Sequence, residues 1–336
     1  MGKMERSDSK PVFGWKKLEA GFFSFTGGEM GKNVLIALLL TFFGLSSGRG
    51  VWAADVNWAS IVPELEGATY VKDTTECEEC HEEYMATYGN TVHGRIFRLN
   101  LKNDKDAIDC ENCHGPMSKH LDAPRKKPPL LVSFSITSQE NKNKICIQCH
   151  AGGMQIGWKG SLHRRSGLSC PDCHYTMERK SDRKLLITER ATEACFKCHT
   201  EKKGQALKSS HMPVREGKMG CESCHSPHGS GNSKMLKAGS VNDLCYSCHA
   251  EKRGPFVWEH APVRENCSNC HDPHGSNNPR MLITKGAFLC LSCHQYGGHV
   301  NLPRYNRASS PYGQGCINCH SRIHGSNHPS GAKLTR

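Results

Sequence analysis

The chain has one long continuous run of hydrophobic residues, at residues 34–45 (VLIALLLTFFGL), just after Lys32. Small residues and then Val51-Trp52-Ala53 follow the run, which predicts a secretory signal peptide with cleavage after Ala53. The run is too short for a comfortable transmembrane helix, and an uncleaved N-terminal anchor is the alternative. Because Met30 would begin a leader of ordinary length, the natural start of the chain is also expected there.

Beyond the leader, no stretch of useful length alternates between apolar and polar positions, so no β-strand is predicted. Residues 55–76 have the composition of a solvated segment. The rest is expected to form short helical turns joined by loops rich in glycine and proline, such as Gly152-Gly153 and Pro128-Pro129. With a mean hydropathy of −0.58, the chain is too polar for a conventional core. The pattern favours a mostly α-helical and irregular protein with little regular secondary structure.

The cysteines show what replaces such a core. All 20 of them lie in ten copies of the pattern Cys-x-x-Cys-His. This spacing is the attachment signal of c-type haem, in which two thiols bond to the porphyrin and the histidine is the proximal iron ligand. The cysteine pairs are Cys77 and Cys80, Cys110 and Cys113, Cys146 and Cys149, Cys170 and Cys173, Cys195 and Cys198, Cys221 and Cys224, Cys245 and Cys248, Cys267 and Cys270, Cys290 and Cys293, and Cys316 and Cys319. The proximal histidines are His81, His114, His150, His174, His199, His225, His249, His271, His294 and His320.

Two other uses of paired cysteines fit less well. Zinc ribbons and disulfide scaffolds both contain cysteine pairs, but neither requires a histidine after every second cysteine. Neither explains why no cysteine lies outside the pattern. We therefore predict ten covalently bound c-type haems, which themselves form the core of the fold. The chain without haem is expected to be largely unfolded.

The motifs belong to an internal repeat. The stretch from His211 (HMPVRE) matches the stretch from His260 (HAPVRE), and the two motifs after each histidine also match, with a period of roughly 46 residues. Each unit thus carries two haem sites. Weaker copies begin at His93 and His163, and a final half-unit begins at His299.

Ten further histidines lie outside the motifs, as many as there are irons. Most of them recur in two places of the repeat, either shortly before a cysteine pair or shortly after a proximal histidine. A six-coordinate iron needs a second axial ligand, so these residues are the predicted distal ligands. The first group is His93, His163, His211, His260 and His299, and the second is His120, His228, His274 and His324. A histidine of the second group lies on the wrong side of its own haem, so we expect it to cap a neighbouring one.

One unit departs from this pattern. After His174 the sequence continues Tyr175-Thr176-Met177, which places a methionine where parallel units have His228 and His274. The favoured interpretation is one iron with histidine and methionine ligands, because Met177 follows the repeat. The alternative is that Met177 only packs and His328 is the tenth distal ligand. A thioether ligand would raise the potential of that haem.

The charge of the chain requires the cofactors to be counted. The formal net charge is +12, and removal of the leader, with seven basic and four acidic residues, leaves +9. Each ferric haem adds about +1 at its core and about −2 from its two propionates, so ten haems contribute about −10 and the holoprotein is near neutral when oxidised. The basic residues are therefore predicted to pair with propionates rather than with nucleic acid.

The segments VNDLCYSCHAEKRGPFVWEHAPVRENCSNCHDPHGS (241–276) and CINCHSRIHGSNHPSG (316–331) resemble the decahaem cytochromes of the MtrA/MtoA/PioA family, also called DmsE-type. The likeness extends from about residue 70 to the C-terminus. It implies a multihaem cytochrome c fold, an elongated haem ladder with two pentahaem halves, at 54–205 and 206–336. The family generally has histidine at the position of Met177 and retains the histidine of the Ser-Asn-His-Pro tail, which is His328 here.

The resemblance also implies a role and partners. Such a chain would be exported to the periplasm and inserted into an outer-membrane β-barrel porin, so that electrons cross the outer membrane. Its other partners would be periplasmic or inner-membrane cytochromes and either an outer-surface multihaem cytochrome or soluble or mineral iron, in Fe(II) oxidation or in metal reduction. No catalytic residue is predicted. The alternatives are a soluble periplasmic electron shuttle and a multihaem reductase, which would need an open iron coordination site and nearby acid–base groups.

Overall fold

The computed structural model describes residues 56–335, except 74, 105 and 295–314. The predicted signal peptide and the predicted ligand His299 lie outside the described residues. Contacts gather Ala53–Arg336 into one compact unit. The boundary near residue 205 between two pentahaem halves stays a prediction. No helix in the described part of the chain is both long enough and apolar enough to cross a membrane.

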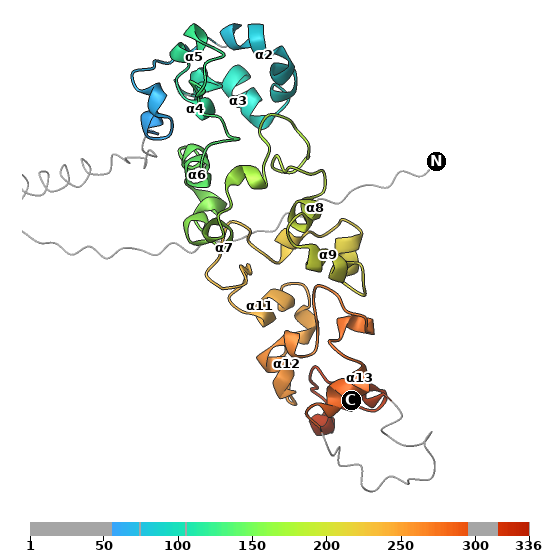
Figure 1. Ribbon diagram of the computed structural model, residues 1–336. Coiled ribbons are helices and arrows are strands. Elements are labelled where there is room, and N and C mark those ends of the chain that lie inside the picture. The colour runs from blue at the N-terminus through green and yellow to red at the C-terminus, as the bar shows by residue number, and fades with distance from the viewer. Residues whose placement is uncertain (1–55, 74, 105, 295–314, 336) are drawn as a thin grey trace, which may run out of the picture. The chain divides into compact units, whose positions relative to one another are not determined.

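Short helices joined by loops make up this unit (Figure 1). Within the described ranges there is no named strand, only isolated β-bridges, which confirms the predicted helical and irregular fold. The α-helices are α2 (Thr75–Tyr88), α3 (Val92–Leu99), α4 (Glu111–His114), α5 (Ser118–Asp122), α6 (Gln139–Ile147), α7 (Leu162–Arg165), α8 (Ala191–Phe196), α9 (Thr200–Ala206), α10 (Met212–Arg215), α11 (Val241–Tyr246), α12 (Ala261–Glu265) and α13 (Gly286–Leu291). Single 3₁₀ turns include η6 (Cys170–Asp172), η7 (Cys221–Ser223), η9 (Cys267–Asn269) and η12 (Cys316–Asn318).

Each cysteine motif forms one helical turn. From the Cys110 motif onward, the backbone N–H of every proximal histidine donates to the carbonyl of the first cysteine of its motif, at N···O distances of 2.8–3.1 Å. This is the i→i−4 hydrogen bond of an α-helix. It places the two thiols one turn apart, with the imidazole beside the second. The motif therefore folds locally into the geometry that its chemistry requires.

The N-terminal part of the unit has a small hydrophobic core. Trp58, Leu65, Val132 and Ile145 form a buried cluster, against which Cys113 also packs. Trp58 is only 8% exposed and Leu65 only 3%, so the prediction that residues 55–76 are solvated is wrong for these side chains. The reason is tertiary: two 3₁₀ turns, η1 (Trp58–Ser60) and η2 (Pro63–Leu65), turn the apolar residues of this segment toward partners far along the chain.

Glu111 fastens the same segment. Its buried carboxylate accepts hydrogen bonds from the backbone N–H groups of Val71, Lys72 and Met117, at 2.8–3.1 Å. A buried carboxylate is tolerated when several backbone donors satisfy it. The second residue of the Cys110 motif thus anchors the N-terminal segment to the first complete repeat unit.

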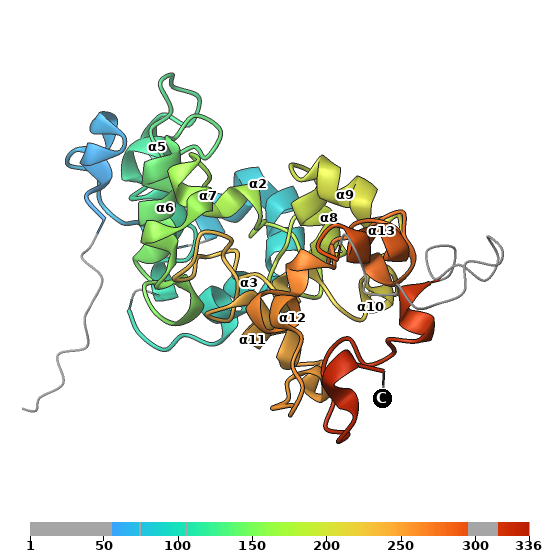
Figure 2. The ribbon, with the colours of Figure 1, turned by 90° about the horizontal axis from the view of Figure 1, so that it is seen from below.

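The segments that lead into the repeat units make backbone contacts with later units. Ser209, just before His211, pairs with Ser276 in the unit that begins at His260, and Trp258, just before His260, pairs with Ser326 in the final half-unit, each in an antiparallel bridge. Next to the first bridge, Gly275 has a φ of +123°, and a Cβ there would lie 2.2 Å from the carbonyl oxygen of Gln205. Only glycine permits both this conformation and this approach. Figure 2 shows the segments around α11 and α12 side by side, as Figure 1 does.

Candidate functional site: ten cysteine–histidine motifs in a row

The first cysteines of the motifs meet in pairs. The side chains lie next to each other in the pairs Cys77 and Cys110, Cys146 and Cys170, Cys195 and Cys221, Cys245 and Cys267, and Cys290 and Cys316. In one such pair, the hydrogen bond from Cys195 lowers the pKa of the Cys221 thiol to about 7 and raises the pKa of Cys195. Every odd-numbered motif therefore touches the motif that follows it.

The second cysteines close the remaining gaps. Burial is the largest cause of the raised pKa of one cysteine in each of four pairs, and the charge of the other cysteine raises that pKa further. The pairs, with the raised cysteine first, are Cys113 and Cys149, Cys173 and Cys198, Cys224 and Cys248, and Cys270 and Cys293. These pairs join every even-numbered motif to the next. All nine successive pairs of motifs are thus neighbours, in the order of the sequence.

The even-numbered motifs share one more feature, which fixes the proximal imidazole. In each of them Nδ1 of the histidine donates a hydrogen bond to a backbone carbonyl further along the chain. The pairs are His114 with Val132 (2.8 Å), His174 with Lys184 (2.8 Å), His225 with Lys234 (2.9 Å), His271 with Arg280 (2.9 Å) and His320 with Lys333 (2.6 Å). A proton on Nδ1 leaves the lone pair on Nε2 for a metal, and it fixes the plane of the ring.

Most proximal histidines face a second imidazole. With metal–imidazole bonds of about 2 Å, two imidazoles on opposite sides of one ion have ring centroids about 6 Å apart. Seven pairs in the structure have centroids 5.9–6.5 Å apart. They are His81 with His120, His150 with His93, His199 with His163, His174 with His228, His225 with His274, His294 with His260, and His271 with His324. Each pair joins a proximal histidine to a histidine that the repeat predicts as a distal ligand.

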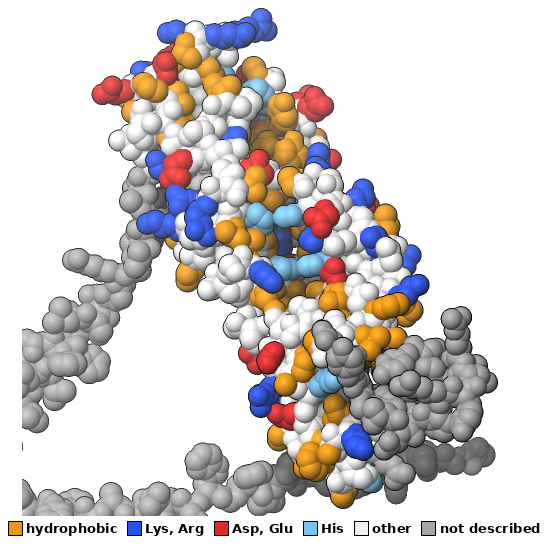
Figure 3. All heavy atoms as spheres, turned by 60° about the horizontal axis from the view of Figure 1, so that its bottom comes forward, with side chains coloured by type: hydrophobic (Ala, Val, Ile, Leu, Met, Phe, Trp, Pro, Cys, Tyr) orange, Lys and Arg blue, Asp and Glu red, His pale blue; other side chains and the backbone are white. Residues whose placement is uncertain are grey.

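The electrostatics favour the ligating form of these side chains. Burial lowers the pKa of the proximal His114 and of six predicted distal histidines, which keeps their imidazoles neutral at pH 7. Metal ions bind the neutral imidazole. The six are His93, His120, His228, His260, His274 and His324. Figure 3 shows histidine side chains along a hollow bordered by hydrophobic side chains, an environment that suits a porphyrin.

The other predicted ligands are placed less directly. His211 repeats the setting of His163, because Nδ1 of His211 donates to Pro273 (3.0 Å) as Nδ1 of His163 donates to Pro227 (2.9 Å). Met177 is half-buried. His328 is exposed, and its carbonyl accepts a hydrogen bond from the indole of Trp258. The ligands opposite His114, His249 and His320 therefore stay predictions.

Sequence reasoning missed two parts of the site. The carbonyls that fix the proximal rings, such as that of Val132, carry no side-chain signal and depend on how the loop returns to its motif. Trp158 is buried and lies edge-on to His228, with ring centroids 6.3 Å apart. Its position eight residues after the third motif could have drawn attention to it, since the chain has only five tryptophans.

Comparisons with known proteins agree with this site. The family model described as a doubled CXXCH motif matches residues 163–204, 211–254 and 260–298. These matches begin at the same histidines as the repeat units. The chain is 37% identical to the multiheme cytochrome MtrA of Shewanella baltica (strain OS185) over 331 residues, which cover 91% of this chain and 98% of that protein. It is also 28% identical over 130 residues to the cytochrome c-type protein NrfB of Escherichia coli O6:H1 (strain CFT073), or 38% of this chain and 65% of that protein.

The nearly full-length match and the repeated motifs confirm the predicted cofactors, about ten covalently bound c-type haems. They also confirm a multihaem electron-transfer protein rather than a multihaem reductase. On this evidence the chain belongs to the MtrA family of multihaem c-type cytochromes.

Proposed function

We propose that this cytochrome is a conduit that carries electrons across the outer membrane from inside a porin partner. The observation that supports the proposal is the unbroken series of neighbouring motifs from Cys77 to Cys316. When bound, each haem accepts and releases one electron. The chain's part is to hold successive sites next to one another and to set their potentials through ligands and burial.

The proposed distal ligands are the nine histidines of the repeat and either Met177 or His328. Seven of the nine lie opposite a proximal histidine at a distance that suits one iron between them. The nine are His93, His120, His163, His211, His228, His260, His274, His299 and His324. Ten six-coordinate irons would leave no coordination position open to a substrate, which suits electron transfer rather than catalysis.

Removal of one distal imidazole should open one iron. We expect the His228→Ala variant to keep ten haems and to bind carbon monoxide at a single site, because the ring opposite His174 is missing. His228→Met is the matched control, since a thioether restores six-coordination and carbon monoxide should not bind rapidly. Intact mass and a carbon monoxide titration of the reduced protein measure both properties. A His228→Ala protein that does not bind carbon monoxide would contradict the assignment of His228 as the distal ligand opposite His174.

The partners follow from the same proposal. A porin would enclose the cytochrome, and periplasmic or inner-membrane cytochromes would exchange electrons with one end of the ladder. At the other end, the partner would be an outer-surface multihaem cytochrome or soluble or mineral iron. Both directions of flow, Fe(II) oxidation and metal reduction, use the same series of sites.

Deletion of the porin tests this partnership. We expect the cytochrome to fractionate with the outer membrane in cells that have the porin and to be released with the periplasmic fraction in cells that lack it. In detergent extracts the porin and the cytochrome should co-purify in equal amounts. A cytochrome found wholly in the periplasmic fraction of both strains would favour the soluble shuttle instead. Retention on the membrane without the porin would indicate an uncleaved N-terminal anchor.

A further inference from the structure

Three loops of the chain have the same backbone structure, and each follows an even-numbered motif. In them the N–H groups of Tyr175, Ser226 and Asp272 donate to carbonyls nine or ten residues ahead, at 2.7–2.8 Å. The bridges that close the loops are His174 with Leu186, His225 with Leu236, and His271 with Leu282. Met177, His228 and His274 each lie three residues after the proximal histidine of their own loop. They therefore occupy equivalent positions in the structure as well as in the sequence.

The histidines at this position face the preceding repeat unit. His228 lies opposite His174, with ring centroids 6.0 Å apart and planes at 18°, and His274 lies opposite His225, at 6.0 Å and 14°. In each case the facing histidine is the proximal ligand of the first motif of the unit before. His324, in the last half-unit, faces His271 in the same way, at 6.3 Å and 16°. The same relation, applied one unit earlier, pairs Met177 with His114.

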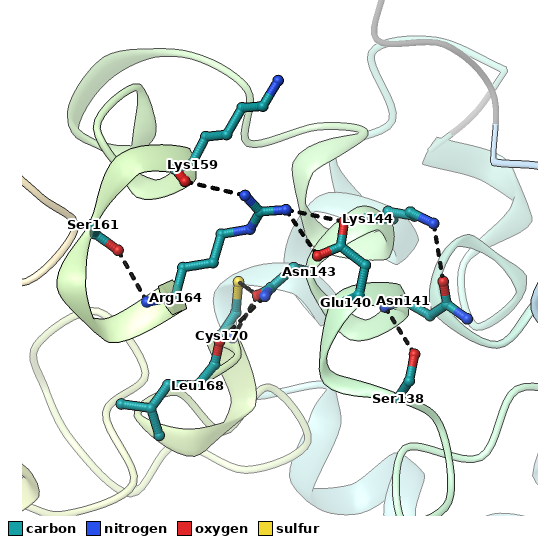
Figure 4. A network of polar contacts seen from close by, with 10 residues as sticks. All are labelled: Ser138, Glu140, Asn141, Asn143, Lys144, Lys159, Ser161, Arg164, Leu168 and Cys170. Carbon is teal, nitrogen blue, oxygen red and sulfur yellow. Dashed lines mark hydrogen bonds and ion pairs between the residues drawn. The ribbon is translucent and has the colours of Figure 1, made fainter. Parts of the chain in front are cut away.

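The junction that would place Met177 in this way is built like a later one. The side chain of Asn143 accepts from the backbone N–H of Cys170 (3.0 Å) and donates to the carbonyl of Leu168 (3.3 Å) (Figure 4). Asn242 makes the corresponding bonds to Cys267 (2.8 Å) and Val263 (2.9 Å). Both asparagines precede the first cysteine of their motif by three residues. The later junction is the one across which His274 reaches His225.

Figure 4 also shows a contact that fastens the earlier junction. The guanidinium of Arg164, in α7, binds both carboxylate oxygens of Glu140, in α6, at 2.8 and 3.0 Å. Both hydrogen bonds come from Nη2 of Arg164, so they form one charge-assisted contact between the two helices. The loop of Met177 therefore leaves a well-defined junction.

The Met177 loop differs from the other two loops in the residue directly after this position. Gly229 and Gly275 come after His228 and His274, and both have positive φ values, +110° and +123°. Glu178 takes this place after Met177. Without the glycine, the loop cannot make a backbone approach like that of Gly229, where a Cβ would lie 2.4 Å from the carbonyl oxygen of Gly157. The unbranched methionine side chain, with three rotatable bonds, is suited to reach across a wider gap.

We propose that the thioether of Met177 is the distal ligand of the iron held by His114, which makes this haem the one of highest potential in the ladder. The proposal rests on the ligand set given under the proposed function. It names the iron that Met177 binds, and it leaves His328 without an iron ligand role.

The apolar surroundings of Cys113 act in the same direction, whereas the buried carboxylate of Glu111 in the same motif acts against it. Cys113 packs against the core formed by Trp58, Leu65, Val132 and Ile145, whereas the later motifs have no such cluster among the described residues. A haem in apolar surroundings favours the less charged ferrous state, and so does a thioether ligand. The hydrogen bond from His114 to Val132 does not offset this preference, because four other proximal histidines make the same kind of bond.

Optical spectra of the oxidised ten-haem protein test the ligand. We expect a weak far-red band, the charge-transfer band of thioether-bound ferric haem, in the parent protein. Met177→His should abolish the band and lower the potential of one haem, with ten haems retained. The matched control is Met212→His, at an exposed methionine, which should keep the band. A parent protein without the band, or a band that persists in Met177→His, would overturn the proposal.

Two further comparisons, each of a variant with its control, locate the iron. Removal of one haem by Cys110→Ala with Cys113→Ala should abolish the band, whereas the matched pair Cys221→Ala with Cys224→Ala should retain it. If the first pair does not fold, Phe134→Leu replaces it, because the Phe134 ring lies 5.6 Å from that of His114. Phe134→Leu should shift the band, and Phe288→Leu, at an exposed phenylalanine, should leave it unchanged. If the band is still present after loss of the Cys110 motif, or does not shift in Phe134→Leu, Met177 is bound to another iron.

The test of Met177 as an iron ligand can fail without any consequence for the conduit proposal. The far-red band belongs to the isolated cytochrome, and porin association does not enter the measurement. If His328→Ala opens an iron to carbon monoxide while Met177→Ala does not, His328 is the tenth ligand and the proposal for Met177 fails. If the parent protein already binds carbon monoxide, the six-coordinate ligand set fails as well.

Discussion

Production of the chain without haem attachment is expected to yield an unfolded polypeptide. Beyond residue 150, Trp158 and Leu185 are the large hydrophobic side chains buried in the described residues. Burial of one such side chain stabilises a fold by roughly 1.5–3 kcal/mol, whereas ordering the backbone costs about 1–2 kcal/mol for each residue. The polypeptide alone cannot offset that cost, so porphyrin burial must supply the difference.

Replacement of all motif cysteines by alanine tests this dependence. We expect the far-ultraviolet circular dichroism of the helices to disappear and limited proteolysis to degrade the chain at many sites. The control is Cys316→Ala with Cys319→Ala, which removes only the last haem and should leave a folded nine-haem protein. A haem-free chain with a cooperative unfolding transition would contradict the view that the haems are the core.

Loss of one haem from the middle of the ladder is expected to stop electron exchange between cells and an electrode. Cys221→Ala with Cys224→Ala would remove the site that links the Cys195 motif to the Cys245 motif in the order of the sequence. The current should fall to that of cells without the cytochrome. The control is Phe288→Leu, which keeps all haems and the parent current. An unchanged current in the nine-haem variant, with normal porin association, would mean that electrons do not pass through the motifs in sequence order.

The haem sites could be predicted from the sequence because their chemistry is local. The spacing of Cys110, Cys113 and His114 contains the whole attachment rule, and the backbone turn that it needs spans only those residues. The predicted distal histidines could be identified as a set for a related reason, since the repeat returns them to the same place in each unit. The helical and irregular fold followed from the absence of alternating apolar positions.

The pairing of the histidines could not be predicted in the same way. That His274 faces His225 depends on how two units dock, and a close approach between Gly275 and Gln205 decides that docking. The N-terminal core escaped prediction for a similar reason. Trp58 and Leu65 are buried by Val132 and Ile145, which lie far along the chain, and no local pattern reports such a contact.

The central claim, that electrons cross a membrane through this chain, can be measured in proteoliposomes. Vesicles would contain an encapsulated redox dye and carry the porin with or without the cytochrome, and a membrane-impermeant reductant would be added outside. The account predicts reduction of the dye only in vesicles with both proteins, and its loss when the Cys221 motif is replaced. Equal rates of dye reduction in vesicles with the porin alone would contradict it.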